Sequence, residues 1–446
     1  MTRKYFGTDG IRSTVGTPPL TPEGLTRFAS AVSAWLSQTP PSSERPLVLI
    51  GGDTRSSTPW ILDVLAGTLA GHGIDVCPLG TASTPQLAFE TANSSASAGI
   101  MVTASHNPAR DNGVKLFGAD GFKLTNEDEA RIEALMDAPA FTGAAADAVG
   151  TIAADAVSPS YLNHLKALKG IDLTGLKLVV DAAHGAAFES VQSVFSAFGA
   201  EAVFIGVEPD GLNINDGVGA THTEALSRKV LDVGAFAGIA LDGDADRLIM
   251  VDETGKIVDG DQLLALLATA RHAEGLLQSQ GVAATVMSNL GLERYLAELG
   301  VTLLRTSVGD RHVVEAMRAG GHTLGGEQSG HIVMLDGGTT GDGLLAALKV
   351  LSIAAQDGRA FSQIAQVFEP VPQKLVNVRF KDRNPLESTD VAETISRVTE
   401  QLGADGRMLV RKSGTEPLIR IMVEAVDDAQ LDTALADIET AVRAAI

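Results

Sequence analysis

One serine lies where a short apolar segment meets a polar loop. Residues 99–102 are apolar and the sequence TASHNP follows at 103–108, so Ser105 stands at the end of a predicted buried strand. A serine in this place is held rigidly yet stays open to solvent, which suits a nucleophile or a carrier of a phosphoryl group. An ordinary Asn-Pro turn would look the same, and the flanks lack the GxSxG pattern of an α/β-hydrolase. Lys115, further along the chain, could return to the same site.

Three acidic residues alternate in a second loop. Asp242, Asp244 and Asp246 precede Arg247, between the apolar segments 236–241 and 248–251. Because alternate residues of an extended chain share one face, we expect the carboxylates to point the same way and to repel each other unless a cation lies among them. Oxygen ligands without a neighbouring Cys or His favour Mg²⁺ or Ca²⁺ over zinc. An EF-hand fails at its sixth position, where Arg247 replaces glycine, and three solvated acids in a turn remain the structural alternative.

A third loop, GGEQSGH at 325–331, combines two glycines with a carboxylate, an amide, a hydroxyl and an imidazole. Such a loop can hydrogen-bond a polyol such as a sugar ring, through Glu327, Ser329 and His331. A glycine-rich surface turn would have much the same sequence. This loop therefore indicates a sugar-binding site only when it is considered together with the other loops.

A fourth loop, RKSGTEPLIR at 411–420, lies between two predicted strands. Its glycine permits a concave turn whose amides and hydroxyls, with the forked donors of two arginines, could surround a phosphate. The candidate ligands are Arg411, Ser413, Gly414, Thr415 and Arg420. A basic hairpin tip is the alternative, but three cations within ten residues are conspicuous in a chain of net charge −21.

The composition excludes several classes of protein. The 446 residues include 34 Lys and Arg against 55 Asp and Glu, and 45% of residues are hydrophobic. An acidic chain with few aromatic residues and no basic tract is a poor partner for nucleic acid. The apolar run 263–270 is too short to span a bilayer, the N-terminus has no apolar signal region, and the lone Cys77 cannot form an intramolecular disulfide. We therefore expect a globular cytoplasmic protein without nucleic-acid or membrane partners.

One pattern of elements occurs three times. At 46–79, 176–206 and 282–306, a β-rich segment, an amphipathic helix, a glycine and a second apolar segment follow each other. Apolar strands joined by helices favour parallel pairing with both sheet faces covered, as in α/β proteins. The spacing favours three similar mixed α/β domains over one large sheet.

The tail of the chain has a different order of elements. Strands are predicted at 374–380, 408–411 and 418–424, and helices at 390–402 and 428–444, which is typical of a small α+β domain. The predicted domains are 1–155, 156–256, 257–368 and 369–446. Each carries one of the four loops.

Together the four loops resemble those of the α-D-phosphohexomutases, in the same order and behind the N-terminal string FGTDGIR at 6–12. The resemblance covers nearly the whole chain and implies four domains around a central cleft. Within this family, the members that act on amino sugars have the most similar motifs. The matching motifs are the start GTDGIR, Gln328 and the elements at 213–215 and 221–222. The implied enzyme is an intramolecular phosphotransferase of the isomerase class, interconverting glucosamine 6-phosphate and glucosamine 1-phosphate on the route to UDP-N-acetylglucosamine and peptidoglycan precursors.

The resemblance also implies roles for the first two loops. Ser105 would be a phosphoserine in the resting enzyme, and one Mg²⁺ per chain would be held by that phosphate with Asp242, Asp244 and Asp246. Because a phosphoserine adds about −1.5 to −2 charges, the metal and Arg247 would offset the repulsion. Glucosamine 1,6-bisphosphate would be the intermediate.

The remaining roles concern protons and substrate. Lys115 is the first choice for the acid or base, with His106 and His331 as alternatives, and Arg12 would contact a phosphate. Glu327 and Ser329 would contact the sugar, and the fourth loop would hold the non-reacting phosphate. The implied partner is a small-molecule sugar phosphate, and the family likeness makes a homodimer plausible.

Three other functions stay open at this point. A phosphomannomutase/phosphoglucomutase has the same chemistry with a different group at C2 of the sugar. A Mg²⁺-dependent phosphatase would use an aspartate of the second loop as nucleophile. A non-catalytic sugar-phosphate sensor would need neither a phosphorylated serine nor turnover.

Overall fold

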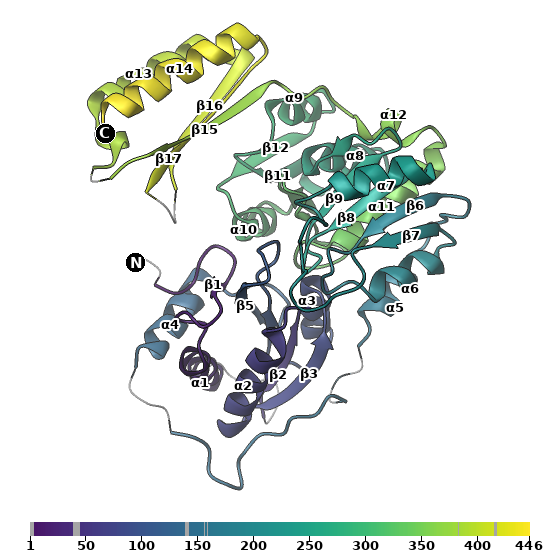
Figure 1. Ribbon diagram of the computed structural model, residues 1–446, viewed down its shortest axis with the longest axis vertical. Coiled ribbons are helices and arrows are strands. Elements are labelled where there is room, and N and C mark those ends of the chain that lie inside the picture. The colour runs from purple at the N-terminus through teal and green to yellow at the C-terminus, as the bar shows by residue number, and fades with distance from the viewer. Residues whose placement is uncertain are drawn as a thin grey trace.

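The structure is a computed structural model that describes residues 4–38, 45–138, 142–155, 157, 159–381, 383–413 and 417–446. Four sheets follow each other along the chain, each in its own unit (Figure 1). Gly414 and Thr415, two of the predicted phosphate ligands, lie outside the described residues. Within the described residues, no helix combines the length and apolar character needed to cross a bilayer.

The first unit is built on a five-stranded sheet of order β1-β5-β4-β2-β3. Strand β2 pairs in parallel with β3 and β4, whereas β5 is antiparallel to β4 and to β1. Its elements are β1 (Ile11–Thr14), α1 (Pro22–Gln38), β2 (Leu47–Gly52), α2 (Thr58–Gly71), β3 (Asp75–Thr81), α3 (Thr84–Ala92), β4 (Ala98–Val102), β5 (Asp111–Gly118) and α4 (Asn126–Met136).

The second unit repeats this order of strands, with a sheet β10-β9-β8-β6-β7. Strand β6 is parallel to β7 and β8, and β9 is antiparallel to β8 and β10. Its elements are α5 (Tyr161–Lys166), β6 (Lys177–Asp181), α6 (Ser190–Ala197), β7 (Glu201–Ile205), α7 (Glu224–Val233), β8 (Ala237–Leu241), β9 (Leu248–Asp252) and β10 (Ile257–Val258). The sheet thus extends two residues beyond the predicted end of this domain at 256.

The third unit keeps four of the five strands of the pattern, in the order β12-β11-β13-β14. Strand β11 is parallel to β12 and β13, and β14 is antiparallel to β13. Its elements are α8 (Gly260–Ala273), the 3₁₀ turn η1 (Gln278–Gln280), β11 (Gly281–Thr285), α9 (Leu290–Glu298), β12 (Thr302–Thr306), α10 (Asp310–Gly320), β13 (Leu324–Gly326), β14 (Ile332–Met334), α11 (Gly343–Asp357) and α12 (Phe361–Ala365).

The fourth unit is an antiparallel sheet of order β15-β17-β16, with two long helices on one side of it (Figure 1). Val391 and Val398 of α13 and Leu431 and Ile438 of α14 are buried in the same apolar cluster as the inward side chains of β17. Its elements are β15 (Gln373–Arg379), the 3₁₀ turns η2 (Pro385–Glu387) and η3 (Gly403–Asp405), α13 (Thr389–Leu402), β16 (Gly406–Lys412), β17 (Leu418–Ala425) and α14 (Asp428–Ala444).

These units confirm the predicted fold class of three similar mixed α/β domains followed by an α+β domain. The three predicted strand-helix-strand repeats are β2-α2-β3, β6-α6-β7 and β11-α9-β12, each with parallel strands. The cores are less separate than the repeats suggest. One apolar cluster contains Leu178 and Ile239 of the second sheet together with Leu264 of α8 and Leu348 of α11, so the second and third units share a core.

Candidate active site

Three of the predicted loops occupy the same place in the repeated unit. The serine loop joins β4 to β5, the aspartate loop joins β8 to β9, and the loop 327–331 joins β13 to β14. In each unit the loop leaves a parallel strand and enters the antiparallel strand beside it. Each of the three units therefore carries one candidate site loop at the equivalent strand connection.

The serine loop is held in an uncommon backbone conformation. Ser105 has φ +52°, in the left-handed region that non-glycine residues rarely adopt, and only 1% of the residue is exposed. Its amide donates to Thr103 Oγ1 (2.9 Å), and its hydroxyl donates to Asp242 Oδ2 (2.6 Å). Ser105 and the aspartate loop, 137 residues apart in the chain, are thus in direct contact.

The aspartate loop gathers its carboxylates by a turn, so the expectation of an extended chain was wrong. The Ala245 amide donates to the Asp242 carbonyl (3.0 Å), and Ala245 has φ +58°. The three carboxylates, all buried, nevertheless bring oxygen atoms within 4.8 Å of one another. A turn can collect side chains that alternate in sequence because it curls the backbone around them.

This carboxylate cluster fits a divalent cation. Within the part of the chain that the structure describes, Asp244 Oδ1 and Asp246 Oδ1 are buried and accept no hydrogen bond, and an all-oxygen donor set suits Mg²⁺. Burial and the charges of Asp246 and Asp244 raise the pKa of Asp242 well above its usual value. Although burial works in the opposite direction, Lys115 and His331 hold the pKa of Asp246 well below its usual range. The raised pKa of Asp242 thus reflects repulsion from its two neighbouring carboxylates as well as burial, and a bound cation would relieve both.

Lys115 is the principal cation of this cluster. Its Nζ lies 2.7 Å from Asp244 Oδ2, 2.9 Å from Asp246 Oδ2 and 3.2 Å from Asp9 Oδ2. Although burial acts to lower it, the pKa of Lys115 is raised well above its usual value by these carboxylates. In this arrangement Lys115 is an ammonium that supplies positive charge, and its role as acid or base stays a prediction.

The two candidate histidines are placed differently. His106 Nδ1 lies 3.3 Å from Ser105 Oγ, and burial with the charges of Arg247 and Arg12 lowers the pKa of His106 to about 4. Its imidazole is therefore neutral near pH 7 and able to accept a proton. His331 instead accepts the Gly341 amide at Nε2 (3.1 Å) and places Nδ1 3.7 Å from Asp246 Oδ1, an arrangement that orients the aspartate.

Two arginines complete the cation set around the serine. Arg247 donates its amide to Asp242 Oδ1 (3.1 Å), and its Nε lies 4.0 Å from Asp242 Oδ2. Arg12 forms an ion pair with Asp9, and Lys123 bridges Asp9 to Asp310 of α10. Asp9 and Lys123 were not among the predicted site residues, because Asp9 was read only as part of the string FGTDGIR and Lys123 stands in no motif.

The loop 327–331 packs directly on the strand that follows the aspartates. The Leu248 amide donates to the Gly330 carbonyl (2.9 Å), and a Cβ on Gly330 would lie 2.2 Å from the Leu248 carbonyl oxygen. Glycine is therefore required at this close approach. Glu327 Oε1 accepts the Gly309 amide (3.1 Å) and Glu327 Oε2 accepts the Ser329 hydroxyl (3.3 Å).

In the fourth loop two arginines lie side by side, and a bound anion would reduce the repulsion between their charges. Arg411 on β16 and Arg420 on β17 are direct partners in the sheet register, and like charges in that position repel. Burial and the charge of Arg420 lower the pKa of Arg411, and among the described residues Arg420 Nε is buried without a hydrogen-bond partner. Ser413 donates its amide to the Leu418 carbonyl (2.8 Å) at the end of this hairpin. No hydrogen bond or ion pair between described residues joins this hairpin to the other three loops.

Further residues that the sequence did not single out hold the first two loops together. Thr84, at the start of α3, donates its hydroxyl to Asp244 Oδ2 (2.5 Å) and its amide to the Asp244 carbonyl (3.0 Å). Asn215 donates to the carbonyls of Ser105 (2.9 Å) and Asn107 (3.1 Å). Thr84 stands in no recognisable motif, Asn215 lies in the element 213–215 but was given no role in the site, and Arg55, which contacts the same loop, follows an ordinary buried strand.

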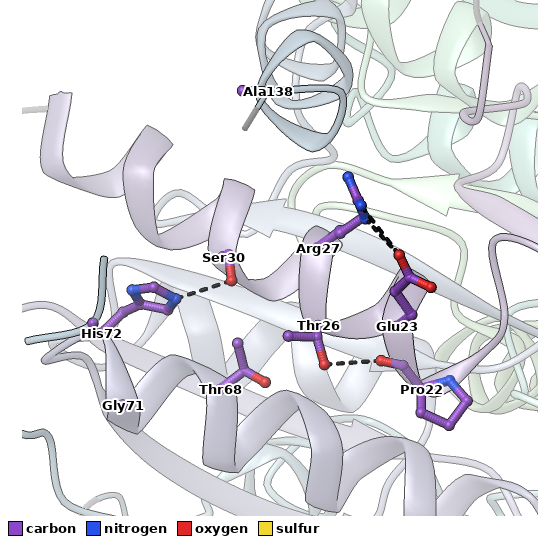
Figure 2. Close-up of a pocket in the computed structure, with 10 residues that line it drawn as sticks. Pro22, Glu23, Thr26, Arg27, Ser30, Thr68, Gly71, His72 and Ala138 are labelled. Carbon is purple, nitrogen blue, oxygen red and sulfur yellow. Dashed lines mark hydrogen bonds and ion pairs between the residues drawn. The ribbon is translucent and has the colours of Figure 1, made fainter. Parts of the chain in front are cut away.

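A cavity of about 640 Å³ lies elsewhere in the first unit, between α1 and the end of α2 (Figure 2). None of the predicted site residues lines it. Its polar side chains bond each other, as in the contact of Ser30 Oγ with His72 Nε2 (2.9 Å) and the ion pair of Arg27 with Glu23. The cavity therefore adds no residue to the candidate site.

Comparison with known families gives four matches in chain order. The descriptions are phosphoglucomutase/phosphomannomutase alpha/beta/alpha domain I at residues 3–143, domain II at 159–255, domain III at 259–371, and the C-terminal domain at 375–441. The matches together span most of the chain, and each contains one of the four loops.

Two curated relatives match the chain over nearly all of its length. A phosphoglucosamine mutase of Zymomonas mobilis is 49% identical over 429 residues, covering 96% of each chain. One from a Jannaschia species is 48% identical over 452 residues, covering all of both. Identity of this level over the full length indicates that the chain shares the function of these relatives as well as their fold.

Solved structures show the same architecture. A phosphoglucomutase/phosphomannomutase family protein of Burkholderia thailandensis has a TM-score of 0.82 at 25% identity, covering 98% of this chain and 97% of that one. The N-acetylphosphoglucosamine mutase of Aspergillus fumigatus, solved with GlcNAc-6P and magnesium, has a TM-score of 0.65 at 19% identity and covers 99% and 96%.

Proposed function

The chain belongs to the phosphoglucomutase/phosphomannomutase family of α-D-phosphohexomutases, and we propose on that basis that it interconverts glucosamine 6-phosphate and glucosamine 1-phosphate. It is a mutase, an isomerase that transfers a phosphoryl group within one molecule. The names of the relatives at 46–49% identity support glucosamine phosphate as the substrate.

The observation that carries the proposed chemistry is the contact between Ser105 Oγ and Asp242 at 2.6 Å. The Ser105 hydroxyl thus lies at the edge of three carboxylates that fit a divalent cation, which supports a role for Ser105 as the phosphoryl carrier. A phosphoryl group on this hydroxyl would be next to that cation and to Arg247. Such a site can stabilise the charge of phosphoryl transfer, which depends mainly on positioning and electrostatics.

In the proposed reaction, phosphoserine at Ser105 gives its phosphoryl group to a free hydroxyl of the sugar phosphate. The P–O bond to Ser105 breaks and a P–O bond to the sugar forms. The sugar hydroxyl loses its proton to a base, and the departing Ser105 oxygen takes up a proton to become a hydroxyl again. The product of this step is glucosamine 1,6-bisphosphate. After the intermediate turns over, its other phosphoryl group returns to Ser105, so no phosphate is consumed.

The chain's residues have distinct proposed roles in this cycle. Asp242, Asp244 and Asp246 would hold one Mg²⁺, which when bound supplies positive charge beside the phosphoryl oxygens. Neutral His106, 3.3 Å from Ser105 Oγ, is placed to exchange a proton at that oxygen; Lys115 and His331 remain the other candidates. Arg12 and Arg247 would contact phosphate oxygens, Glu327 and Ser329 the sugar, and Arg411, Ser413, Gly414, Thr415 and Arg420 the non-reacting phosphate.

The substrate can be tested by comparing kcat/KM for three sugar phosphates. We expect glucosamine 6-phosphate to exceed glucose 6-phosphate and mannose 6-phosphate by about tenfold or more, since one well-placed polar contact to the 2-amino group contributes about 1.5–3 kcal/mol. Higher kcat/KM for mannose or glucose 6-phosphate would favour a phosphomannomutase/phosphoglucomutase. Release of inorganic phosphate without an isomer would indicate a phosphatase.

The fourth loop can be tested at Arg420. Replacing Arg420 with alanine removes a forked donor and should raise KM by roughly tenfold to a hundredfold, since a charge-assisted contact contributes about 1.5–3 kcal/mol. Arg443→Ala is the matched control, because Arg443 is an exposed arginine that pairs with Glu439 on α14. If Arg420→Ala and Arg443→Ala gave the same KM and kcat, the hairpin would not be the phosphate site.

The proposal has three other parts, of which the homodimer rests on the family resemblance and the other two rest on the sequence. They are a cytoplasmic location, a homodimer, and domain boundaries at 1–155, 156–256, 257–368 and 369–446. Size-exclusion chromatography with light scattering would test the dimer.

A further inference from the structure

The guanidinium of Arg55 lies behind the serine loop with its side chain fully buried. Its Nε donates to Asp53 Oδ2 (2.9 Å). Its Nη1 donates to the carbonyls of Pro108 (2.5 Å) and Asp111 (3.0 Å), and its Nη2 donates to those of Ser105 (3.0 Å) and Asn107 (2.8 Å). An arginine has five N–H donors, so every one of them is used, and four bond the backbone of one loop.

Asp53 ties the same loop from a second side. Its Oδ2 accepts both the Arg55 Nε and the Thr103 hydroxyl (2.7 Å), and Thr103 Oγ1 in turn accepts the Ser105 amide (2.9 Å). Ser105 is therefore fixed at its amide through Thr103 and at its carbonyl through Arg55. These two ties act on the residue whose φ of +52° needs support from its surroundings.

We infer that Asp53 and Arg55 form a clamp that positions the Ser105 hydroxyl for phosphoryl transfer, and that Arg55 is a positioning residue of the reaction. The inference rests on the proposed role of Ser105. The clamp also holds four carbonyl oxygens of the loop at the guanidinium. Because of these bonds, the oxygens cannot turn toward a negatively charged phosphoryl group on Ser105 without losing a hydrogen bond from Arg55.

Lysine cannot replace this clamp. Its ammonium has three donors on one nitrogen, whereas the guanidinium is a rigid fork that reaches four carbonyls over residues 105–111. Arg55→Lys keeps the charge opposite Asp53 but loses the geometry. A small displacement of a reacting group can lower the rate by about 10²-fold, so we expect kcat to fall by about that factor while KM changes less than about twofold.

The experiment compares Arg55→Lys with Arg271→Lys in the full chain with Mg²⁺. Arg271 is another buried arginine that bonds a carboxylate, Asp336 (2.8 Å), and a backbone carbonyl, but it belongs to the third unit and touches none of the four loops. For each variant, kcat and KM are measured per folded molecule, with the folded fraction taken from calorimetry. Single-turnover transfer from glucose 1,6-bisphosphate to Ser105 is followed by intact mass.

The clamp is supported if Arg55→Lys slows both kcat and single-turnover transfer with KM little changed, while Arg271→Lys leaves all three near wild type. A folded Arg55→Lys protein with wild-type kcat would overturn it, as would equal losses in both variants. If Arg55→Lys does not fold, Asp53→Asn replaces it, with an expected loss in kcat of about tenfold; wild-type kcat in that variant would likewise overturn the clamp. An active Ser105→Ala variant would instead refute the proposed role of Ser105 itself.

Discussion

Replacement of Ser105 by alanine is expected to abolish interconversion of the glucosamine phosphates, with kcat lower by more than about 10⁴-fold, as for loss of other catalytic nucleophiles. The hydroxyl is the only group of Ser105 that alanine lacks, and it is the atom that lies 2.6 Å from Asp242. Alanine has the same Cβ and should adopt the same backbone with the Arg55 bond to its carbonyl intact. The measurement is turnover of glucosamine 6-phosphate with Mg²⁺ and catalytic bisphosphate present.

Ser33→Ala provides a matched control for this variant. Ser33 is also buried, but it lies in α1 and donates its hydroxyl to the Ala29 carbonyl, so its loss should leave turnover unchanged. Intact mass of the purified proteins gives a second readout, because wild type and Ser33→Ala should carry a phosphoryl adduct that Ser105→Ala lacks. Near-normal turnover by Ser105→Ala would end the phosphocarrier proposal.

The local signals in the sequence were sufficient for the elements, whereas the contact between the serine loop and the aspartate loop was expected only from the family resemblance. Apolar segments with helices between them predicted the parallel strands of the three repeats, since that pattern records burial on both faces of a sheet. Ser105 and the aspartates were chosen because each follows a predicted buried strand, but these strands, β4 and β8, belong to different sheets, so the local pattern did not place them together. The structure brings these residues into direct hydrogen-bonding contact.

A return of Lys115 to this site was expected, but the partners that it and the other site residues bond could not be predicted, because they depend on pairing between distant segments. Lys115 reaches Asp244 and Asp246 from β5, whose antiparallel register pairs Lys115 with Met101. The carboxylates gather through the turn at Ala245, which the alternation of acids and small residues does not encode. Arg55 and Asn215 donate to backbone carbonyls, and because every residue has a carbonyl, the sequence does not indicate which ones will be bonded.

The shared core of the second and third units has a similar explanation. The apolar faces of α8 and α11 predict burial but do not specify what covers them. In the structure they pack with strands of the second sheet, and Gly343 at the start of α11 lies so close to the aspartate loop that a Cβ there would be 2.4 Å from the Arg247 carbonyl. The amide of Gly343 donates to the Ala245 carbonyl (3.0 Å). The third unit therefore supports the aspartate loop of the second from behind.

Removal of divalent cations is expected to lower turnover by about 10³-fold or more, and added Mg²⁺ should restore it, since charge stabilisation supplies most of the rate in phosphoryl transfer. The chain should stay folded without the metal, because Lys115 already contacts Asp244 and Asp246. Loss of activity on chelation would then report the reaction and not unfolding. Circular dichroism before and after chelation checks this point.

Asp246→Asn tests whether the aspartate cluster is the place where that cation acts. A ligand that binds only the folded state stabilises it by RT ln(1 + [L]/Kd), so Mg²⁺ should raise the Tm of the wild type and much less that of Asp246→Asn. Asp336→Asn is the control, because Asp336 is a half-exposed carboxylate that pairs with Arg271 away from the cluster. We expect Asp336→Asn to keep both the Tm shift and the activity. The asparagine lacks the negative charge that attracts the cation, and it lacks one of the oxygens that the described chain leaves without a hydrogen bond. A full Mg²⁺-dependent Tm shift and wild-type turnover in Asp246→Asn would therefore place the metal elsewhere.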